Sequence, residues 1–175
     1  MTYLHTISSP VGPLHLASDG TSLTGLWLES QKYFAATLEA ETEEKRLPVF
    51  DQTAAWLEAY FAGNAPGPLP PLAPKGTAFR QAVWQLLLDI PYGQTVTYGG
   101  LARALRESGH KAAAQAVGGA VGHNPISILI PCHRVVGANG SLTGYAGGVA
   151  VKQRLLAIEG VDVSRLFVPK TGTAL

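Results

Sequence analysis

A proline-rich stretch over residues 63–74 divides this chain of 175 residues. It contains five prolines, two glycines and no charged residue. Because proline fixes φ and has no amide hydrogen, so dense a run cannot continue a helix or a central strand. We therefore expect an extended, semi-rigid connector with a domain on each side of it. We place the boundary so that residues 1–75 form an N-terminal α/β structural domain with this linker, and residues 76–175 form a C-terminal domain.

The net charge changes sign at the same boundary. Residues 1–75 carry four basic and eight acidic side chains, a net charge of −4. Residues 76–175 carry nine basic and four acidic side chains, a net charge of +5. The total of +1 hides this difference. Such asymmetry indicates that a polyanion, such as a nucleic acid, binds the second half only.

The chain has one cysteine, Cys132, so it can form neither an internal disulfide nor a cysteine-rich zinc site. Hydrophobic residues make up 46% of it and charged residues 14%, which is typical of a globular protein. No apolar run approaches the roughly 18–20 residues that a membrane span needs, and no signal peptide is seen. We expect a cytoplasmic protein with no membrane partner.

Short apolar and β-branched runs at the start of the chain predict strands, because turn residues separate them. Three runs fit this pattern: 2–8, 13–18 and 22–28. Spacings this short favour an antiparallel meander. Helical periodicity follows over 30–43 and 51–61, and Asp51 is the expected cap of the second helix. The first domain is therefore expected to be a small sheet with helices.

Helical patterns dominate the second half. The expected helices are 77–89, 99–106, 112–122 and 149–159, with Gly160 after the last, and the expected strands are 95–98 and a buried run, 126–130. The second and third helices, with a short polar break between them, have the outline of a helix-turn-helix. The third is rich in Ala and Gly, so its backbone can closely approach either a neighbouring helix or a nucleic-acid groove. Residues 166–175 are expected to form a loose extension.

Cys132 lies in the sequence Pro-Cys-His-Arg, directly after the buried run. A lone cysteine is commonly a small buried hydrophobe, but imidazole and guanidinium neighbours favour the thiolate. Complete ionisation of the thiol would lower a reaction barrier by only about 2 kcal/mol, so substrate positioning must supply much of the rest. Successive residues of an extended chain point to opposite faces. Unless the chain turns there, His133 would reach the thiol through a water and would be oriented by a carboxylate.

The second half contains four carboxylates that could orient His133: Asp89, Glu107, Glu159 and Asp162. Glu159 ends the last expected helix, and it lies near the core if that helix packs Leu155 and Leu156 inward. Spacing does not prove this choice. A cysteine hydrolase with Cys132, His133 and Glu159 as its triad stays open, although the adjacency of Cys and His counts against it.

Five motifs occur in order in the second half: AVGGAV at 116–121, Asn124-Pro125, IPCHRVV at 130–136, GYAGG at 144–148 and LLAIEG at 155–160. Together they closely resemble the O6-alkylguanine-DNA alkyltransferases, or methylated-DNA–protein-cysteine methyltransferases. The resemblance runs over about residues 76–160. It implies an α+β protein, with a ribonuclease-H-like first domain and a winged-helix-like second domain that contains the helix-turn-helix.

The resemblance implies direct repair of double-stranded DNA. An alkyl group, typically methyl, passes to Cys132 from O6-alkylguanine, after the base is flipped out from the minor groove. Whether O4-alkylthymine is a second substrate stays open. A thioether offers no carbonyl for water to attack, so the reaction is a single turnover that consumes the protein. The family further implies a monomer without a cofactor. A non-catalytic lesion binder of the alkyltransferase-like kind stays open as an alternative, although such binders lack the nucleophile.

The family's catalytic residues can be carried over one by one. Cys132 matches the alkyl acceptor, His133 the base that takes the thiol proton through water, and Glu159 the carboxylate that orients this base. Asn124 matches the asparagine that braces the active-site segment. Tyr98 matches the tyrosine whose hydroxyl donates to the flipped guanine.

Binding residues follow from the same resemblance. The implied substrate-binding residues are Tyr98, Val135, Tyr145, Ala146 and Gly147, with the backbone of Cys132, Val135 and Ala146 on the guanine edge. The implied DNA-binding residues are Arg80, Gly99, Ala113, Ala114, Gln115 and Gly118. We expect a structural ion-pair role for Arg134. Some members bind zinc through cysteines of the first domain, and because this chain has none there we expect no metal.

Gln115 departs from the family pattern. Members typically have an arginine here that fills the gap left by the flipped base, and glutamine lacks the charge and stacking plane of guanidinium. We expect slower capture of damaged duplex, with the reaction toward free O6-benzylguanine less affected. A second departure is a slightly longer break, over 106–110, between the two helices.

Overall fold

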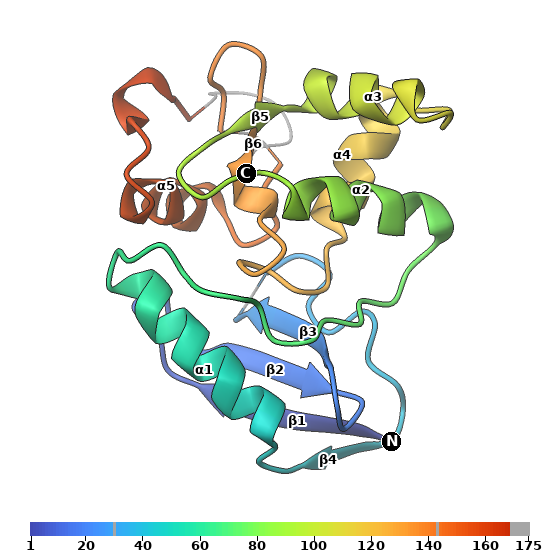
Figure 1. Cartoon of the computed structure of the whole chain (residues 1–175), viewed down its shortest axis with the longest axis vertical. Coiled ribbons are helices and arrows are strands. Elements are labelled where there is room, and N and C mark those ends of the chain that lie inside the picture. The colour runs from blue at the N-terminus through green and yellow to red at the C-terminus, as the bar shows by residue number, and fades with distance from the viewer. Residues whose placement is uncertain (30, 143, 169–175) are drawn as a thin grey trace.

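A computed structural model describes residues 1–29, 31–142 and 144–168 (Figure 1). The loose extension expected over 166–175 lies outside the described residues from position 169 onward. None of the helices within the described ranges is long and apolar enough to pass through a bilayer.

A four-stranded sheet forms the base of the first half, with strand order β3-β2-β1-β4. The strands β1 (Thr2–Ile7), β2 (Leu14–Ser18) and β3 (Leu23–Leu28) form the predicted antiparallel meander. The short β4 (Thr42–Glu44) pairs in parallel with β1 at the edge. One long helix, α1 (Pro48–Phe61), lies across a face of this sheet, as Figure 1 shows.

The prediction of a helix over residues 30–43 is wrong. Residues 32–37 form turns instead, and Tyr33 and Ala35 have φ angles of 57° and 55°, in the left-handed region that a right-handed helix cannot include. Contacts with distant residues override the local helical pattern here. Phe34 packs edge-on against His15 at a centroid distance of 5.1 Å, and Tyr33 stacks on His123 in the second half.

The helix α1 begins earlier than expected. Pro48 is its first residue, where the missing amide hydrogen costs nothing, and Leu47 is the N-cap. Asp51 therefore lies in the first turn and does not cap the helix; its Oδ1 accepts a hydrogen bond from Nε of Arg46 at 2.9 Å.

In the second half, the described residues form four α-helices and a two-stranded parallel pair. The elements are α2 (Ala78–Leu88), β5 (Val96–Thr97), α3 (Tyr98–Glu107), α4 (Ala114–Gly122), the 3-10 turn η1 (Cys132–Arg134), β6 (Val135–Val136), α5 (Val149–Ile158) and the 3-10 turn η2 (Val163–Arg165). The four helices agree with the predicted ones to within two residues at each end. Gly160 follows α5 with φ of 81°, a conformation that favours glycine at the end of a helix.

The apolar run that the sequence marks as a buried strand is not one. Ile126 alone pairs, in a single bridge to Leu26 of β3, and Ile128 has φ of 72°, which bends the segment. Asn124 stabilises the bend, because its Oδ1 accepts from the amide of Ile126 at 3.0 Å and its Nδ2 donates to the carbonyl of Ile130 at 2.8 Å. An unbroken apolar run alone does not distinguish a strand from a bent buried segment.

One hydrophobic core spans both halves of the chain. It joins side chains of the sheet and α1, such as Phe50, to those of α2, such as Trp84. The proline-rich connector lies along the edge of β3. There the amide of Leu23 donates to the carbonyl of Pro71, and the amide of Ala73 donates to that of Leu23, both at 2.8 Å. The two halves therefore hold each other in place around the segment that carries Cys132.

Candidate active site

Cys132 is a free, buried thiol at the start of η1. The chain does turn between Cys132 and His133, so the extended geometry considered from the sequence does not apply here. Burial raises the pKa of the thiol, while a hydrogen bond with the Asn124 side chain and the charge of Lys152 act in the opposite direction. The thiol is therefore protonated at rest, and a reaction at the sulfur needs a base.

His133 is fully buried beside the thiol-bearing residue, and its Nε2 hydrogen-bonds Oε2 of Glu159. Of the four carboxylates that the sequence left open, the structure thus selects Glu159. Burial lowers the pKa of His133, so its ring is neutral at neutral pH. With Nε2–H donating to the carboxylate, the other ring nitrogen carries the lone pair. This Nδ1 is buried and has no hydrogen-bond partner among the described residues, so it is available to accept a proton.

Four groups of the described residues donate hydrogen bonds to Glu159. Besides His133, they are Nε of Arg134 at 2.7 Å, the amide of Gly93 at 3.0 Å and the hydroxyl of Tyr60 at 2.6 Å. Burial would raise the pKa of this carboxyl, but its hydrogen bonds and its charged neighbours lower it to about 2. The carboxylate is therefore ionised, and it fixes the orientation of the imidazole.

Arg134 forms the structural ion pair expected of it. Its Nε donates to Glu159, and its Nη1 donates to the carbonyl of Ile90 at 2.8 Å. The guanidinium therefore binds the Glu159 carboxylate and the carbonyl of Ile90, just after α2, rather than the thiol.

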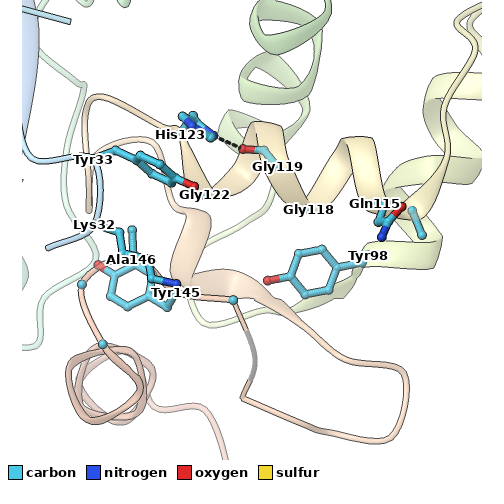
Figure 2. Close-up of a pocket in the computed structure, with 14 residues that line it drawn as sticks. Lys32, Tyr33, Tyr98, Gln115, Gly118, Gly119, Gly122, His123, Tyr145 and Ala146 are labelled. Atoms are coloured by element: carbon cyan, nitrogen blue, oxygen red, sulfur yellow. Dashed lines mark hydrogen bonds between the residues drawn. The ribbon is translucent and has the colours of Figure 1, made fainter. Parts of the chain in front are cut away.

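A cavity of about 760 Å³ opens between α4, the loop 144–148 and a segment of the first half (Figure 2). Its lining residues are Lys32, Tyr33, Tyr98, Ala114, Gln115, Gly118, Gly119, Gly122, His123 and residues 144–148. The predicted substrate-binding residues Tyr98, Tyr145, Ala146 and Gly147 are among them. So are the predicted DNA-binding residues Ala114, Gln115 and Gly118. Burial raises the pKa of both Tyr98 and Tyr145, and the nearby Cys132 sulfur raises it further when it is ionised.

Four of the predicted binding residues are not among those that line the cavity. Val135 is fully buried in β6 opposite Val96, and its amide donates to the carbonyl of Cys132. Arg80 is half-buried in α2, Gly99 is exposed in the first turn of α3, and Ala113 is the exposed N-cap of α4.

Lys152 is a site residue that the sequence reasoning missed. It is fully buried in α5, and its Nζ lies 5.9 Å from the centroid of the Tyr98 ring. Burial lowers its pKa to about 8, although an ionised Cys132 would act to raise it. A signal was present, because helical spacing places Lys152 on the same face as Val149 and Leu156.

The first half also contributes residues that the sequence did not assign to the site. Tyr60, at the end of α1, donates to Glu159, and its Oη lies 3.3 Å from Nε2 of His133. Lys32 and Tyr33 line the cavity. Within the described ranges, no three His, Cys, Asp or Glu side chains are grouped so that they could hold a metal ion.

Models of one protein family match both halves of the chain. The 6-O-methylguanine DNA methyltransferase ribonuclease-like domain matches residues 2–69, and the DNA binding domain of that methyltransferase matches residues 78–161. This chain belongs to the 6-O-methylguanine DNA methyltransferase family. The match confirms the resemblance found in the sequence. It also confirms the fold class, with a ribonuclease-like first domain and a DNA-binding second domain.

Individual methyltransferases of this family are similar along most of the chain. The methylated-DNA–protein-cysteine methyltransferase of Mycobacterium bovis is 45% identical over 159 residues, which cover 91% of this chain and 93% of that protein. The protein of the same name from Haemophilus influenzae is 47% identical over 152 residues, 86% of this chain and 82% of its own. A crystal structure of Mycobacterium tuberculosis OGT in complex with DNA is 43% identical, with a TM-score of 0.79 and 94% of each chain covered.

Proposed function

We propose that this chain repairs O6-alkylguanine in double-stranded DNA by moving the alkyl group irreversibly to Sγ of Cys132. One observation carries the proposal. His133 directly follows the buried Cys132 in the sequence, near a large cavity. Its neutral ring is held at Nε2 by Glu159, and its Nδ1 has no partner among the described residues. The similar methyltransferases named above support the same reaction.

The proposed reaction is a displacement at a saturated carbon. His133 Nδ1 takes the thiol proton through a water, and the Glu159 carboxylate stabilises the imidazolium that forms. The thiolate attacks the alkyl carbon, so the S–C bond forms as the bond from carbon to O6 breaks, and the electron pair moves into guanine. Tyr98 donates a proton to the leaving base, and the proton held by His133 replaces it through solvent. The buried cation of Lys152 stabilises the thiolate during this exchange.

The roles of Tyr98 and Asn124 fit their surroundings. Burial raises the pKa of Tyr98, so its hydroxyl keeps its proton and remains a donor. Asn124 closes the bend before Cys132 and hydrogen-bonds the sulfur. We therefore propose that Asn124 positions the nucleophile, while Tyr98 contacts the flipped base.

The recognition surface that we propose for DNA is the outer face of α4. A Cβ built on Gly118, Gly119 or Gly122 would meet no atom within 4 Å, so these glycines face open space rather than a packed helix. That observation favours the nucleic-acid groove over the neighbouring helix as the partner of this face. A narrow minor groove suits a helix whose leading side chains are this small. Gln115 lies in the first turn, where it can fill the gap left by a flipped base.

The proposal extends to the DNA contacts outside the cavity, the stoichiometry and the place of the reaction. Arg80, Gly99 and Ala113 would contact the DNA backbone beside α4, and one copy of the chain would act on each lesion. We place the activity in the cytoplasm, because the reagent is a reduced thiol and cytosolic thiols are kept reduced. O4-alkylthymine is a second substrate that the same displacement can serve.

Intact-mass analysis after incubation with a duplex containing O6-methylguanine tests the function. We expect the wild-type protein to gain one methyl group and the duplex to lose it in equal amount, with no turnover beyond one equivalent. Cys132→Ser should bind the duplex but gain no mass. Binding by the wild type without a mass gain would support a non-catalytic lesion binder, whereas repeated turnover on an ester or amide would support a cysteine hydrolase.

A further inference from the structure

A segment of the first domain forms one wall of the substrate cavity. Lys32 and Tyr33 line the cavity together with residues of α4 and of the loop 144–148. Figure 2 shows them at the end of the cavity opposite Tyr98 and Gln115, close to Tyr145. Since Tyr98 is the residue proposed to contact guanine, this other end is where an alkyl group on O6 would extend past the sulfur.

Three contacts fix this wall to the second domain. The Oε1 of Gln31 accepts a hydrogen bond from the hydroxyl of Ser127 at 3.2 Å, and the amide of Lys32 donates to the carbonyl of Ala146 at 3.0 Å. Tyr33 stacks on His123 with a centroid distance of 3.7 Å. Tyr33 keeps its left-handed φ of 57° under these contacts. The wall is therefore held in place against the loop that carries the predicted guanine contacts.

The same end of the cavity carries a positive charge. Lys32 is exposed and cationic, and among the described residues that line the cavity none carries a carboxylate. The neighbouring Tyr145 is 7% exposed and lines the same end of the cavity.

We propose that Lys32, beside Tyr145, forms a subsite for O6-alkyl groups that end in an anion, such as carboxymethyl. The inference rests on the proposed alkyl transfer and names its substrate class. A cavity of about 760 Å³ lies in the range that holds drug-sized ligands, so groups larger than methyl fit. The displacement itself is unchanged. The thiolate attacks the methylene carbon, the bond from that carbon to O6 breaks, and guanine leaves with the electron pair, while the carboxylate remains on the new thioether.

The test compares two duplexes of one sequence, one with O6-methylguanine and one with O6-carboxymethylguanine. The measured quantity is the ratio of the two single-turnover rates, carboxymethyl over methyl, from intact mass. Effects on DNA affinity cancel in this ratio. We expect Lys32→Gln to lower the ratio about fivefold and Lys32→Glu to lower it further, since an exposed charge pair contributes up to about 1 kcal/mol. Lys32→Arg should keep the ratio close to that of the wild type.

Lys45→Glu is the matched control. Lys45 is exposed in the same domain, over the ring of Tyr3 and outside the cavity, so this change alters the net charge as Lys32→Glu does. Its ratio should equal that of the wild type. An unchanged ratio in Lys32→Glu, or an equal fall in Lys45→Glu, overturns the subsite. A wild type that takes only methyl also overturns it but leaves the proposed function standing, whereas a wild type that takes neither group overturns both.

Discussion

The hydroxyl of Tyr60 lies 2.6 Å from Oε2 of Glu159, so a residue of the ribonuclease-like domain holds the carboxylate that orients His133 in the other domain. Tyr60 is fully buried and lies on the last turn of α1. The first domain therefore supplies a hydrogen-bond donor to the site, in addition to packing against it.

Tyr60→Phe should slow methyl transfer about tenfold, because hydrogen bonds to charged groups contribute about 1.5–3 kcal/mol. The loss should appear in the rate at saturating DNA, since the changed group does not line the cavity. Tyr92→Phe is the matched control, because the hydroxyl of Tyr92 makes a long hydrogen bond of 3.4 Å, to the uncharged carbonyl of Ile158. Equal rates for the two variants would remove Tyr60 from the positioning of Glu159.

The buried ion pair should make the fold sensitive to acid. Glu159 has a pKa of about 2 in the folded chain against a usual value of 4.5, so its stabilising effect is complete above about pH 4.5 and is lost as the pH falls toward 2. The loss amounts to about 3 kcal/mol. His133, whose pKa burial lowers, adds to the trend below its usual value of 6.5, because the unfolded chain then binds a proton that the folded chain does not.

Urea unfolding at several pH values between 7 and 3 measures this dependence. Glu159→Gln should remove most of the decline below pH 4.5. It should also lower the free energy of unfolding at pH 7 by about 3 kcal/mol, because Arg134 is left buried without its carboxylate. A variant that keeps the wild-type pH dependence would show that the decline comes from other groups.

Elements with strong local signals could be predicted from the sequence. The meander, the connector and the four helices of the second half follow from turn residues, proline and apolar periodicity. The segment 30–43 could not be predicted, because the packing of Tyr33 and Phe34 on distant residues decides it. The bend at Ile128 likewise depends on hydrogen bonds from one side chain, Asn124, that no periodicity shows.

Site residues that lie in family motifs could be predicted from the sequence. Site residues that the first domain contributes could not. Cys132, His133 and Glu159 lie in recognisable motifs, and the structure brings His133 and Glu159 into contact. Tyr60 and Lys32 belong to the other domain. Their place at the site follows from how the two domains pack, which no spacing within the sequence encodes.

Lys152→Met should stabilise the fold and slow methyl transfer. Lys152 has a pKa of about 8 in the folded chain against a usual value of 10.5, so below pH 8 the charged form destabilises the fold. Between pH 8 and 10.5 the folded chain loses that proton while the unfolded chain keeps it, so wild-type stability rises with pH. At pH 7 the variant should be more stable by about 3 kcal/mol. This advantage should disappear as the pH approaches 10.5.

The rate should change in the opposite direction. Without a cation beside Cys132 the thiolate is less favoured, and we expect methyl transfer to fall about tenfold. Thermal unfolding at pH 7 and 10 and the single-turnover rate measure the two effects. Lys45→Met, at an exposed position, should change neither quantity. A Lys152→Met protein with the wild-type rate would exclude the lysine from thiolate stabilisation.

Gln115→Arg tests whether the departure from the family pattern limits the capture of damaged DNA. Gln115 is exposed in the first turn of α4 and lines the cavity, so an arginine there can enter the duplex without disturbing the core. Guanidinium brings a charge and a stacking plane to the orphaned base. Base flipping costs a few kcal/mol, so stabilising the flipped state by about 1.4 kcal/mol would raise the rate on methylated duplex about tenfold.

The free base O6-benzylguanine separates base flipping from chemistry, because it needs no extrusion from a duplex. We expect Gln115→Arg to leave the rate toward this substrate unchanged while the duplex rate increases. Gln115→Ala should lower the duplex rate alone. Equal duplex rates in wild type, Gln115→Arg and Gln115→Ala would show that residue 115 has no part in holding the flipped state. A parallel change toward the free base would instead place its effect in the cavity.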